Sequence, residues 1–208
     1  FGMVLGMSTR RGKVEFLEDV LNDAKNTMHE VMKENPAKYA EIVDPEGTSD
    51  ILAISAIVVQ DMAAKRVKDY KWEIERVTKF EGDTGPYLQY AHSRLRSIER
   101  KAAEAYGFSS DLSSADLSLL TEKEAISLAL LIARYPDVVQ EARITTEPCT
   151  VINYLMLLSR SISTALDRLW VMNQEAPLAM ARMALYTSAR IALGNGLRLI
   201  GLKPLDRM

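Results

Sequence analysis

The stretch FEGDTGPYLQYAHSRLRSI, residues 80–98, carries the clearest structural signal in this 208-residue chain. It begins as a glycine-flanked turn, and Asp83 or Thr84 can cap the helix that follows. Pro86 suits the first turn of that helix, because the N–H that proline lacks would have no partner there. The helix is expected to end just before Gly107, a residue typical of helix C-termini. The stretch therefore predicts a tight turn that leads into a long helix.

One face of this helix combines aromatic and basic side chains near its start. Tyr87, Tyr90 and Arg94 are spaced at i, i+3 and i+7 and so share a face, and Arg96 follows two residues later. Aromatic rings beside a guanidinium group suit unstacked bases and phosphates. Alternatively, the tyrosines are core or hinge aromatics and the arginines extend into solvent. From these residues alone we favour the second interpretation.

Outward from this stretch, apolar residues recur at steps of three and four over most of the chain, which predicts amphipathic helices. A turn is expected at Asp44 to Gly47, Pro36 is expected to end the helix before it, and a capping box is expected at Thr121 to Glu124. Helices are expected over residues 17–35, 51–64, 72–81, 121–135, 136–144, 149–169 and 177–200. A strand is expected only in the first few residues. The fold class is therefore an all-α helical bundle.

The composition is that of a globular protein, with 48% hydrophobic and 26% charged residues. A net charge of −2 excludes a globally basic nucleic-acid binder. Residues 160–208, however, contain seven basic and three acidic side chains. This local excess can attract phosphates. On charge alone we favour an ordinary solvated helix face.

Cysteine, histidine and hydropathy narrow the possibilities further. A single cysteine, Cys149, cannot form an intramolecular disulfide, and a buried, inert thiol is expected there. With only His29 and His92 besides it, no metal site is indicated. No apolar run has the roughly 18 residues that a membrane span needs. The chain begins inside an apolar run without an initiator methionine, so we expect a fragment of a longer protein.

The loop GMSTRRG, residues 6–12, lies between the expected strand and the first helix. Its hydroxyls, guanidinium groups and glycines suit a polyphosphate. It resembles the KMSKS-type loop of class I aminoacyl-tRNA synthetases, in the form KMSKRKG, although Gly6 and Thr9 stand where that family has lysines. The resemblance implies that Arg10 and Arg11 stabilise the charge that develops on ATP during adenylate formation. The residues implied to contact ATP beside them are Met7, Ser8, Thr9 and Gly12.

The string FEGDTGPYLQYAH, residues 80–92, resembles the signature of arginyl-tRNA synthetases. With this resemblance we favour an RNA-binding role for the aromatic and basic face over a role as core or hinge aromatics. Residues 147–170 and 181–208 resemble the anticodon-binding helical domain of that family, down to a C-terminal methionine. The resemblance implies that Tyr87 and Arg94 contact the anticodon arm, with Met208 in the same region. The implied tRNA-binding residues are Tyr87, Tyr90, Arg94, Arg96 and Met208.

Positions 166 and 170 lie near the end of the expected helix 149–169. Eukaryotic members of the family have a tyrosine against the anticodon four residues before Trp170, whereas this sequence has Leu166. That contact is therefore not carried over to this chain. Trp170 matches the family, but its place on the apolar stripe is equally compatible with a core tryptophan.

The resemblance implies a eukaryotic cytosolic, fungal-like arginyl-tRNA synthetase that activates L-arginine with ATP and Mg²⁺ and transfers it to tRNA(Arg). We expect the end of the catalytic domain at residues 1–13, a stem-contact region at 14–79 and an anticodon-binding domain at 80–208. The chain alone is expected to bind tRNA but not to aminoacylate it. DNA and membrane partners are not expected, and the expected location is cytoplasmic, with a mitochondrial pool as the alternative. The alternative function is a helical scaffold that no longer uses tRNA.

Overall fold

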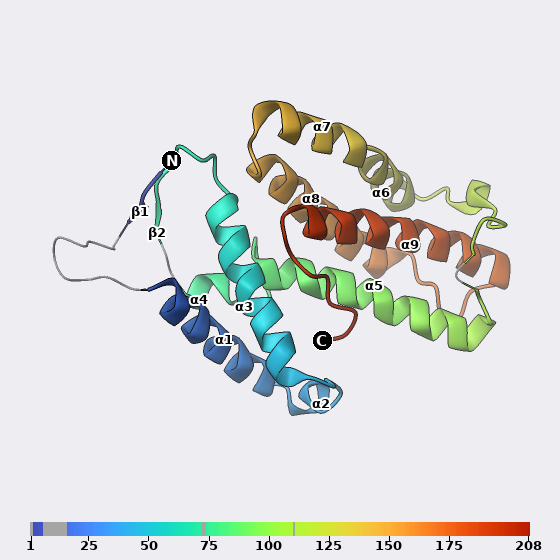
Figure 1. Cartoon of the computed structure of the whole chain (residues 1–208). Helices are drawn as coiled ribbons and strands as arrows, with labels where there is room; N and C mark the ends of the chain where they lie inside the picture. The colour runs from blue at the N-terminus through green and yellow to red at the C-terminus, as the bar shows by residue number, and fades with distance from the viewer. Residues whose placement is uncertain (1, 6–15, 72–73, 110) are drawn as a thin grey trace.

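The computed structural model describes residues 2–5, 16–71, 74–109 and 111–208. A short parallel pair is formed by β1 (Val4–Leu5) and β2 (Tyr70–Lys71), with Val4 opposite Tyr70. The helices are α1 (Leu17–Lys33), α2 (Pro36–Tyr39), α3 (Pro45–Met62), α4 (Ile74–Val77), α5 (Gly85–Tyr106), α6 (Lys123–Ala133), α7 (Tyr135–Thr145), α8 (Cys149–Arg168) and α9 (Ala176–Leu199), with a 3₁₀ turn η2 (Leu117–Leu119). The expected helical fold is confirmed, with a two-stranded sheet added at one end (Figure 1).

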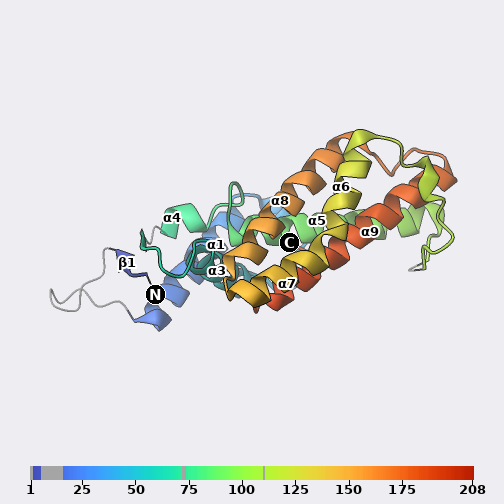
Figure 2. The same cartoon turned by 90° about the horizontal axis from the view of Figure 1, so that it is seen from above.

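The larger of two hydrophobic cores lies among α5, α6, α8 and α9, with α7 packed on the outside of α8 (Figure 2). Leu88 and Leu95 from α5 meet Leu155 and Leu158 from α8 and Leu193 from α9, and all five are fully buried. Burying one such side chain stabilises the fold by about 1.5–3 kcal/mol. The apolar stripe predicted for residues 151–169 forms the α8 part of this core.

The smaller core joins α1 to α3 beside the start of α5. Met28 and Met32 from α1 pack there with Leu52 and Ala53 from α3. The segment after α9, residues 202–208, crosses between the two cores, and we call it the C-terminal tail. Leu202 belongs to the larger core, and Leu205 belongs to the smaller one. The tail therefore connects the two packed bodies.

The turn before α5 forms as the sequence predicts. The Thr84 hydroxyl accepts a hydrogen bond from the Tyr87 N–H and donates one to the Lys79 carbonyl. At Gly85 the backbone touches α3 directly, because a β-carbon would lie 2.0 Å from the Ser55 carbonyl oxygen. Gly107 ends the helix with a φ of 68°, a left-handed conformation that glycine adopts without strain. Both ends of α5 are thus fixed by local chemistry.

Several predicted boundaries were wrong, each for a local reason. The predicted turn at Asp44 is the start of α3, because its carboxylate caps the helix by accepting the Gly47 N–H and Pro45 occupies the first turn. The first helix does end before Pro36, as predicted, but Pro36 also begins α2, with Asn35 as its cap. The expected capping box of Thr121 and Glu124 does not form, because the N-cap of α6 is Glu122, one residue later, and no side chain caps the helix.

Two further differences concern residues 70–84. Within the described part of the expected helix over residues 72–81, α4 covers Ile74–Val77, and the chain then leaves the helix with a turn at Thr78 and bends at residues 80–83. The strand β2 was not predicted at all, because a two-residue strand has no detectable periodicity.

Candidate nucleic-acid interface

A groove of about 730 Å³ lies where α5 meets the α2 region and the C-terminal tail. Three of the predicted site residues, Tyr90, Arg94 and Met208, line it together. Its complete lining is Lys38, Glu41, Ile42, Tyr90, Ser93, Arg94, Ser97, Arg100, Lys101, Glu104, Arg207 and Met208. Five basic side chains face two acidic ones, so the groove is positively charged although the chain as a whole is not.

The floor of the groove is one stripe of α5. Tyr90, Arg94, Ser97 and Lys101 follow at steps of four, three and four residues, which places them on one face of the helix. Sequence reasoning identified the first two and missed the others. Continuing the same periodicity by two helical turns would have found them.

The opposite wall comes from α2 and the residues after it, more than fifty positions earlier in the chain. The Lys38 ammonium lies 5.6 Å from the centroid of the Tyr90 ring, within the range of a cation–π contact. An aromatic ring with a lysine above it is a surface suited to a base and its phosphate. Sequence reasoning could not have found Lys38, because nothing local links α2 to α5.

Arg94 is held only weakly by its own protein. One guanidinium nitrogen lies 3.8 Å from a carboxylate oxygen of Asp167 on α8, and their side chains are 38% and 71% exposed. An ion pair this long and exposed contributes about 0–1 kcal/mol, so a phosphate can compete for the guanidinium. Arg94 thus lies in the groove lining with a guanidinium group that is available to a phosphate.

Trp170 is not a core residue. Its side chain is 63% exposed, and its indole N–H donates to the Asp167 carbonyl, 3.2 Å away. Asp167 thus contacts both Trp170 and Arg94, which places an exposed aromatic surface close to the groove. Leu166, in contrast, is buried in the larger core. The interpretation of Trp170 as a surface contact is therefore favoured over that of a core tryptophan.

Tyr87 lies outside the groove lining, although it shares a helical face with Tyr90. It is half-buried against the larger core, and its hydroxyl lies 3.4 Å from that of Ser163 on α8. Its predicted contact with RNA stays a prediction.

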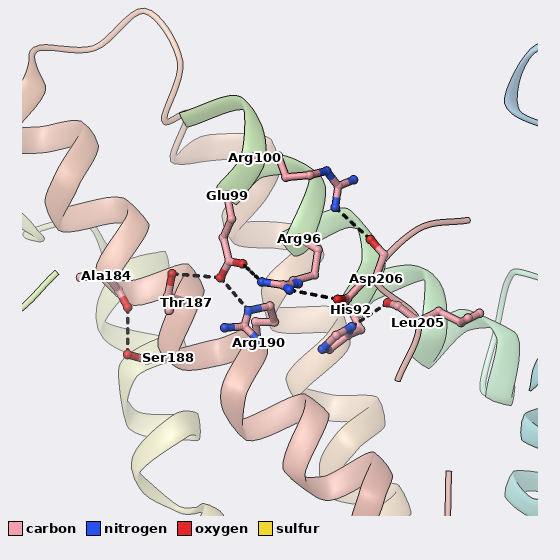
Figure 3. Close-up of polar contacts among 10 residues, drawn as sticks. All are labelled: His92, Arg96, Glu99, Arg100, Ala184, Thr187, Ser188, Arg190, Leu205 and Asp206. Atoms are coloured by element: carbon pink, nitrogen blue, oxygen red, sulfur yellow. Dashed lines mark hydrogen bonds and ion pairs between the residues drawn. The ribbon is translucent and has the colours of Figure 1, made fainter. Parts of the chain in front are cut away.

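Arg96 lies in an ionic network on another side of α5 (Figure 3). Its guanidinium donates to Glu99 and to Asp206 of the tail, each at 2.9 Å. Glu99 in turn accepts from Arg190 and Thr187 of α9. The hydrogen bonds to Asp206 and Glu99 raise the pKa of Arg96, and that to Arg96 lowers the pKa of Asp206. In this conformation Arg96 joins helices and tail rather than lining the groove.

The tail is held by further α5 side chains that sequence reasoning missed. The carboxamide of Gln89, fully buried, donates to the Ser55 hydroxyl and the Lys203 carbonyl and accepts the Leu205 N–H. His92 donates from Nδ1 to the Leu205 carbonyl at 2.8 Å, and burial lowers its pKa. Since both residues lie inside the quoted signature, their burial explains part of its composition.

The basic excess of residues 160–208 does not form one face. Arg160 pairs with Asp83, Arg182 with Glu122 and Arg190 with Glu99. From this segment Arg207 is the basic residue that lines the groove, and the other groove cations come from α2 and α5. The basic surface that lines the groove is therefore not formed by this segment alone but is shared by three segments.

Comparison with known families identifies the segment that contains this groove. The family model described as DALR anticodon binding domain matches residues 88–208, more than half of the chain. The chain belongs to this family. A second model, described as tRNA synthetases class I (R), catalytic domain, matches residues 1–74. The DALR domain therefore supplies α5 and the tail to the groove, while Lys38 comes from the preceding region.

The relatives match this chain over its whole length. It is 52% identical to the cytoplasmic arginine–tRNA ligase of Saccharomyces cerevisiae and 50% identical to a probable cytoplasmic arginine–tRNA ligase of Dictyostelium discoideum, covering 100% of this chain and 34% of each relative. Arginyl-tRNA synthetase of Thermus thermophilus matches in structure with a TM-score of 0.86 at 28% identity, over 99% of this chain and 34% of that one. The chain thus spans about a third of its relatives and corresponds to their C-terminal region, with the DALR domain at its end.

The loop expected to contact ATP lies outside the described residues. This concerns Met7, Ser8, Thr9, Arg10, Arg11 and Gly12. Within the described ranges, no group of three or more histidine, cysteine or acidic side chains is arranged to hold a metal ion. Nor is any helix among those residues both long and apolar enough for a membrane span.

Proposed function

We propose that this chain is the tRNA-binding part of an arginyl-tRNA synthetase and that its groove takes the anticodon arm of tRNA(Arg). The observation that carries the proposal is the convergence of Tyr90, Arg94 and Met208 in one basic groove of a DALR domain. All three are among the residues that the family resemblance implies for tRNA binding.

The chemistry of the groove suits a single-stranded loop better than a duplex. Lysine and arginine side chains neutralise phosphates and release counterions, which makes the affinity depend on salt. The Tyr90 ring and the exposed Trp170 offer flat surfaces on which unpaired bases can stack, worth about 1–3 kcal/mol per base. An anticodon loop presents both features together.

The whole enzyme would activate L-arginine with ATP and Mg²⁺ and transfer it to the 3′ end of tRNA(Arg). The loop at residues 6–12 would contribute Arg10 and Arg11 to the ATP phosphates. We propose that residues 14–79 contact the tRNA stem, that residues 80–208 read the anticodon arm, and that the protein works in the cytoplasm. The 208 residues alone would be inactive, and arginine-dependent ATP–pyrophosphate exchange by them would contradict this.

A scaffold without tRNA binding is the alternative from a different class. It rests on Leu166, Gly6 and Thr9, where this sequence departs from the family pattern. Burial of Leu166 removes one contact, but Trp170 is exposed, and Tyr90 and Arg94 are partly exposed. We therefore favour tRNA binding.

A binding experiment separates the two functions. Affinity for a tRNA(Arg) transcript is measured by gel shift for the wild type, Tyr90→Ala, Arg94→Ala and Lys101→Ala. Arg143→Ala is the matched control, because this arginine is exposed on α7 and does not line the groove. Each groove variant should bind about tenfold more weakly, equivalent to ~1.4 kcal/mol, while the control changes little. Equal binding by all of them would favour the scaffold.

A further inference from the structure

The helix α5 has a second functional face, directed at the C-terminal tail. Gln89, His92, Arg96 and Arg100 follow at steps of three, four and four residues, so they form a stripe beside the groove stripe. Each makes a hydrogen bond to the tail segment 203–206. Beyond this segment the chain enters the groove, where Arg207 and Met208 become lining residues.

Gln89 makes the most specific of these contacts. Its carboxamide accepts the Leu205 N–H at 2.9 Å and donates to the Lys203 carbonyl at 3.0 Å. The Lys203 carbonyl and the Leu205 N–H flank Pro204. In a parallel sheet, one residue likewise bonds to the carbonyl before and the N–H after its opposite residue, so the Gln89 amide pairs with the tail as a neighbouring strand would. A second N–H of the same amide donates to Ser55 on α3, 2.9 Å away. The side chain therefore fixes the tail to both α5 and α3.

No similar side chain provides the same set of bonds. A carboxamide offers two N–H donors and an acceptor, whereas a carboxylate offers acceptors alone. A carboxylate at position 89 would face the Lys203 carbonyl without a proton between them. Because Gln89 is fully buried, water cannot replace a missing partner.

We propose that Gln89 is a positioning residue for RNA binding: it fixes the path of the tail and thereby holds Arg207 and Met208 in the groove. Gln89 itself has no access to RNA, because its side chain is fully buried. The inference rests on the proposed function, since it assumes that the groove binds tRNA. It adds a residue that acts through the tail rather than through a contact of its own.

The test is a double-mutant cycle in the full-length protein, read out by affinity for a tRNA(Arg) transcript. The variants are Gln89→Met, a deletion of residues 207–208, and both combined. Gln140→Met is the matched control, because Gln140 is an exposed glutamine on α7 whose amide contacts Arg143 of the same helix. Gln89→Met should weaken binding about tenfold when residues 207–208 are present. In the variant that lacks residues 207–208, the same substitution should change the affinity little. Losses that multiply in the combined variant would overturn the proposal.

Hydrogen exchange distinguishes a tail effect from general destabilisation. In Gln89→Met, exchange should rise in peptides covering residues 202–208, including the Leu205 amide, and stay unchanged in α8 and α9. Equal increases everywhere would mean a merely structural role. Pro204→Gly loosens the same segment without removing a buried group, so it serves if Gln89→Met does not fold. Unchanged tRNA affinity in Pro204→Gly would then overturn the proposal.

The deletion also separates this inference from the proposed function. If deleting residues 207–208 leaves the affinity unchanged while Arg94→Ala lowers it, the groove binds RNA but Arg207 and Met208 do not contribute to the binding. The inference about Gln89 then fails, and the proposed function stands. If neither change affects binding, the proposed function itself fails.

Discussion

Arg94 and Arg96 lie two positions apart on α5 and have opposite environments. Arg94 has one ion pair of 3.8 Å with an exposed carboxylate, whereas Arg96 makes two contacts of 2.9 Å, with Glu99 and Asp206. The first arginine is left available at a groove, and the second is used to join helix and tail. The same residue type on one helix is thus weakly paired beside the groove on one face and firmly paired to the tail on the other, and the proposed binding role falls to the weakly paired arginine.

The largest effect is expected from removing the acid at the centre of the structural network. Glu99→Ala would leave Arg96 and Arg190 without this partner, and its side chain is only 16% exposed. Breaking such a partly buried network should lower the free energy of unfolding by about 2–3 kcal/mol, measured by urea denaturation. Glu104→Ala, on the exposed part of the same helix, should change it by less than about 0.5 kcal/mol. Similar values for the two variants would remove the distinction between the two faces.

The next effect compares the two arginines directly. Arg96→Ala should cost about 1.5 kcal/mol of stability, because two charged hydrogen bonds are lost. Arg94→Ala should change stability by less than about 0.5 kcal/mol. In tRNA binding, Arg94→Ala should also reduce the slope of log affinity against log salt by about 1. If Arg94→Ala destabilised the fold as much as Arg96→Ala, the comparison would be wrong.

The third effect is a pH dependence confined to the structural face. Burial lowers the pKa of His92 below its ordinary value of 6.5, aided by Arg190 and Arg96 and opposed by the Leu205 carbonyl and Asp206. The unfolded chain therefore takes up the proton first as the pH falls. Stability is fully present above pH 6.5 and is lost as the pH drops from there through the folded pKa, by at most about 1.4 kcal/mol per pH unit.

The measurement is urea denaturation of the wild type and of His92→Asn between pH 7.5 and 5.5. Asparagine can still donate to the Leu205 carbonyl but does not titrate. The variant should show a smaller loss of stability over this range, and parallel curves would exclude His92 as the source.

The smallest effect concerns the weak partner of Arg94. Asp167→Asn removes a negative charge beside the groove and frees the guanidinium. We expect tRNA affinity to rise about twofold at low salt, with stability changed by less than about 0.5 kcal/mol. Asp137→Asn on the first turn of α7 is the control for the change in net charge. Weaker binding by Asp167→Asn would mean that this ion pair orients Arg94 rather than competing for it.

The sequence was sufficient for features that depend on neighbours along the chain. The Thr84 cap, Pro86 in the first turn and the Gly107 stop were all predicted, because each acts within one helical turn. The same reasoning failed at Asp44, where a turn motif and a capped helix start have the same residues. Local chemistry therefore predicted the elements better than their boundaries.

The different ion pairs of Arg94 and Arg96 could not be predicted from the sequence. Their partners Asp167 and Asp206 lie 73 and 110 positions away, and no local pattern links them. The same applies to Lys38 above Tyr90, and to Trp170, whose exposure depends on how α8 packs. The resemblance to a family located the groove stripe, but the pairing of side chains needed the three-dimensional structure.

The hydrogen bonds of the tail also have a consequence for the order of folding during synthesis. Gln89 bonds to residues 114 and 116 positions later, so two of its three partners emerge from the ribosome long after α5 does. The α1–α3 contacts lie close together in the chain and can form early, whereas the groove needs Arg207 and Met208, which are made long after α5. If the groove binds tRNA as proposed, we therefore expect a nascent chain to acquire that affinity only after residues 203–208 have been made.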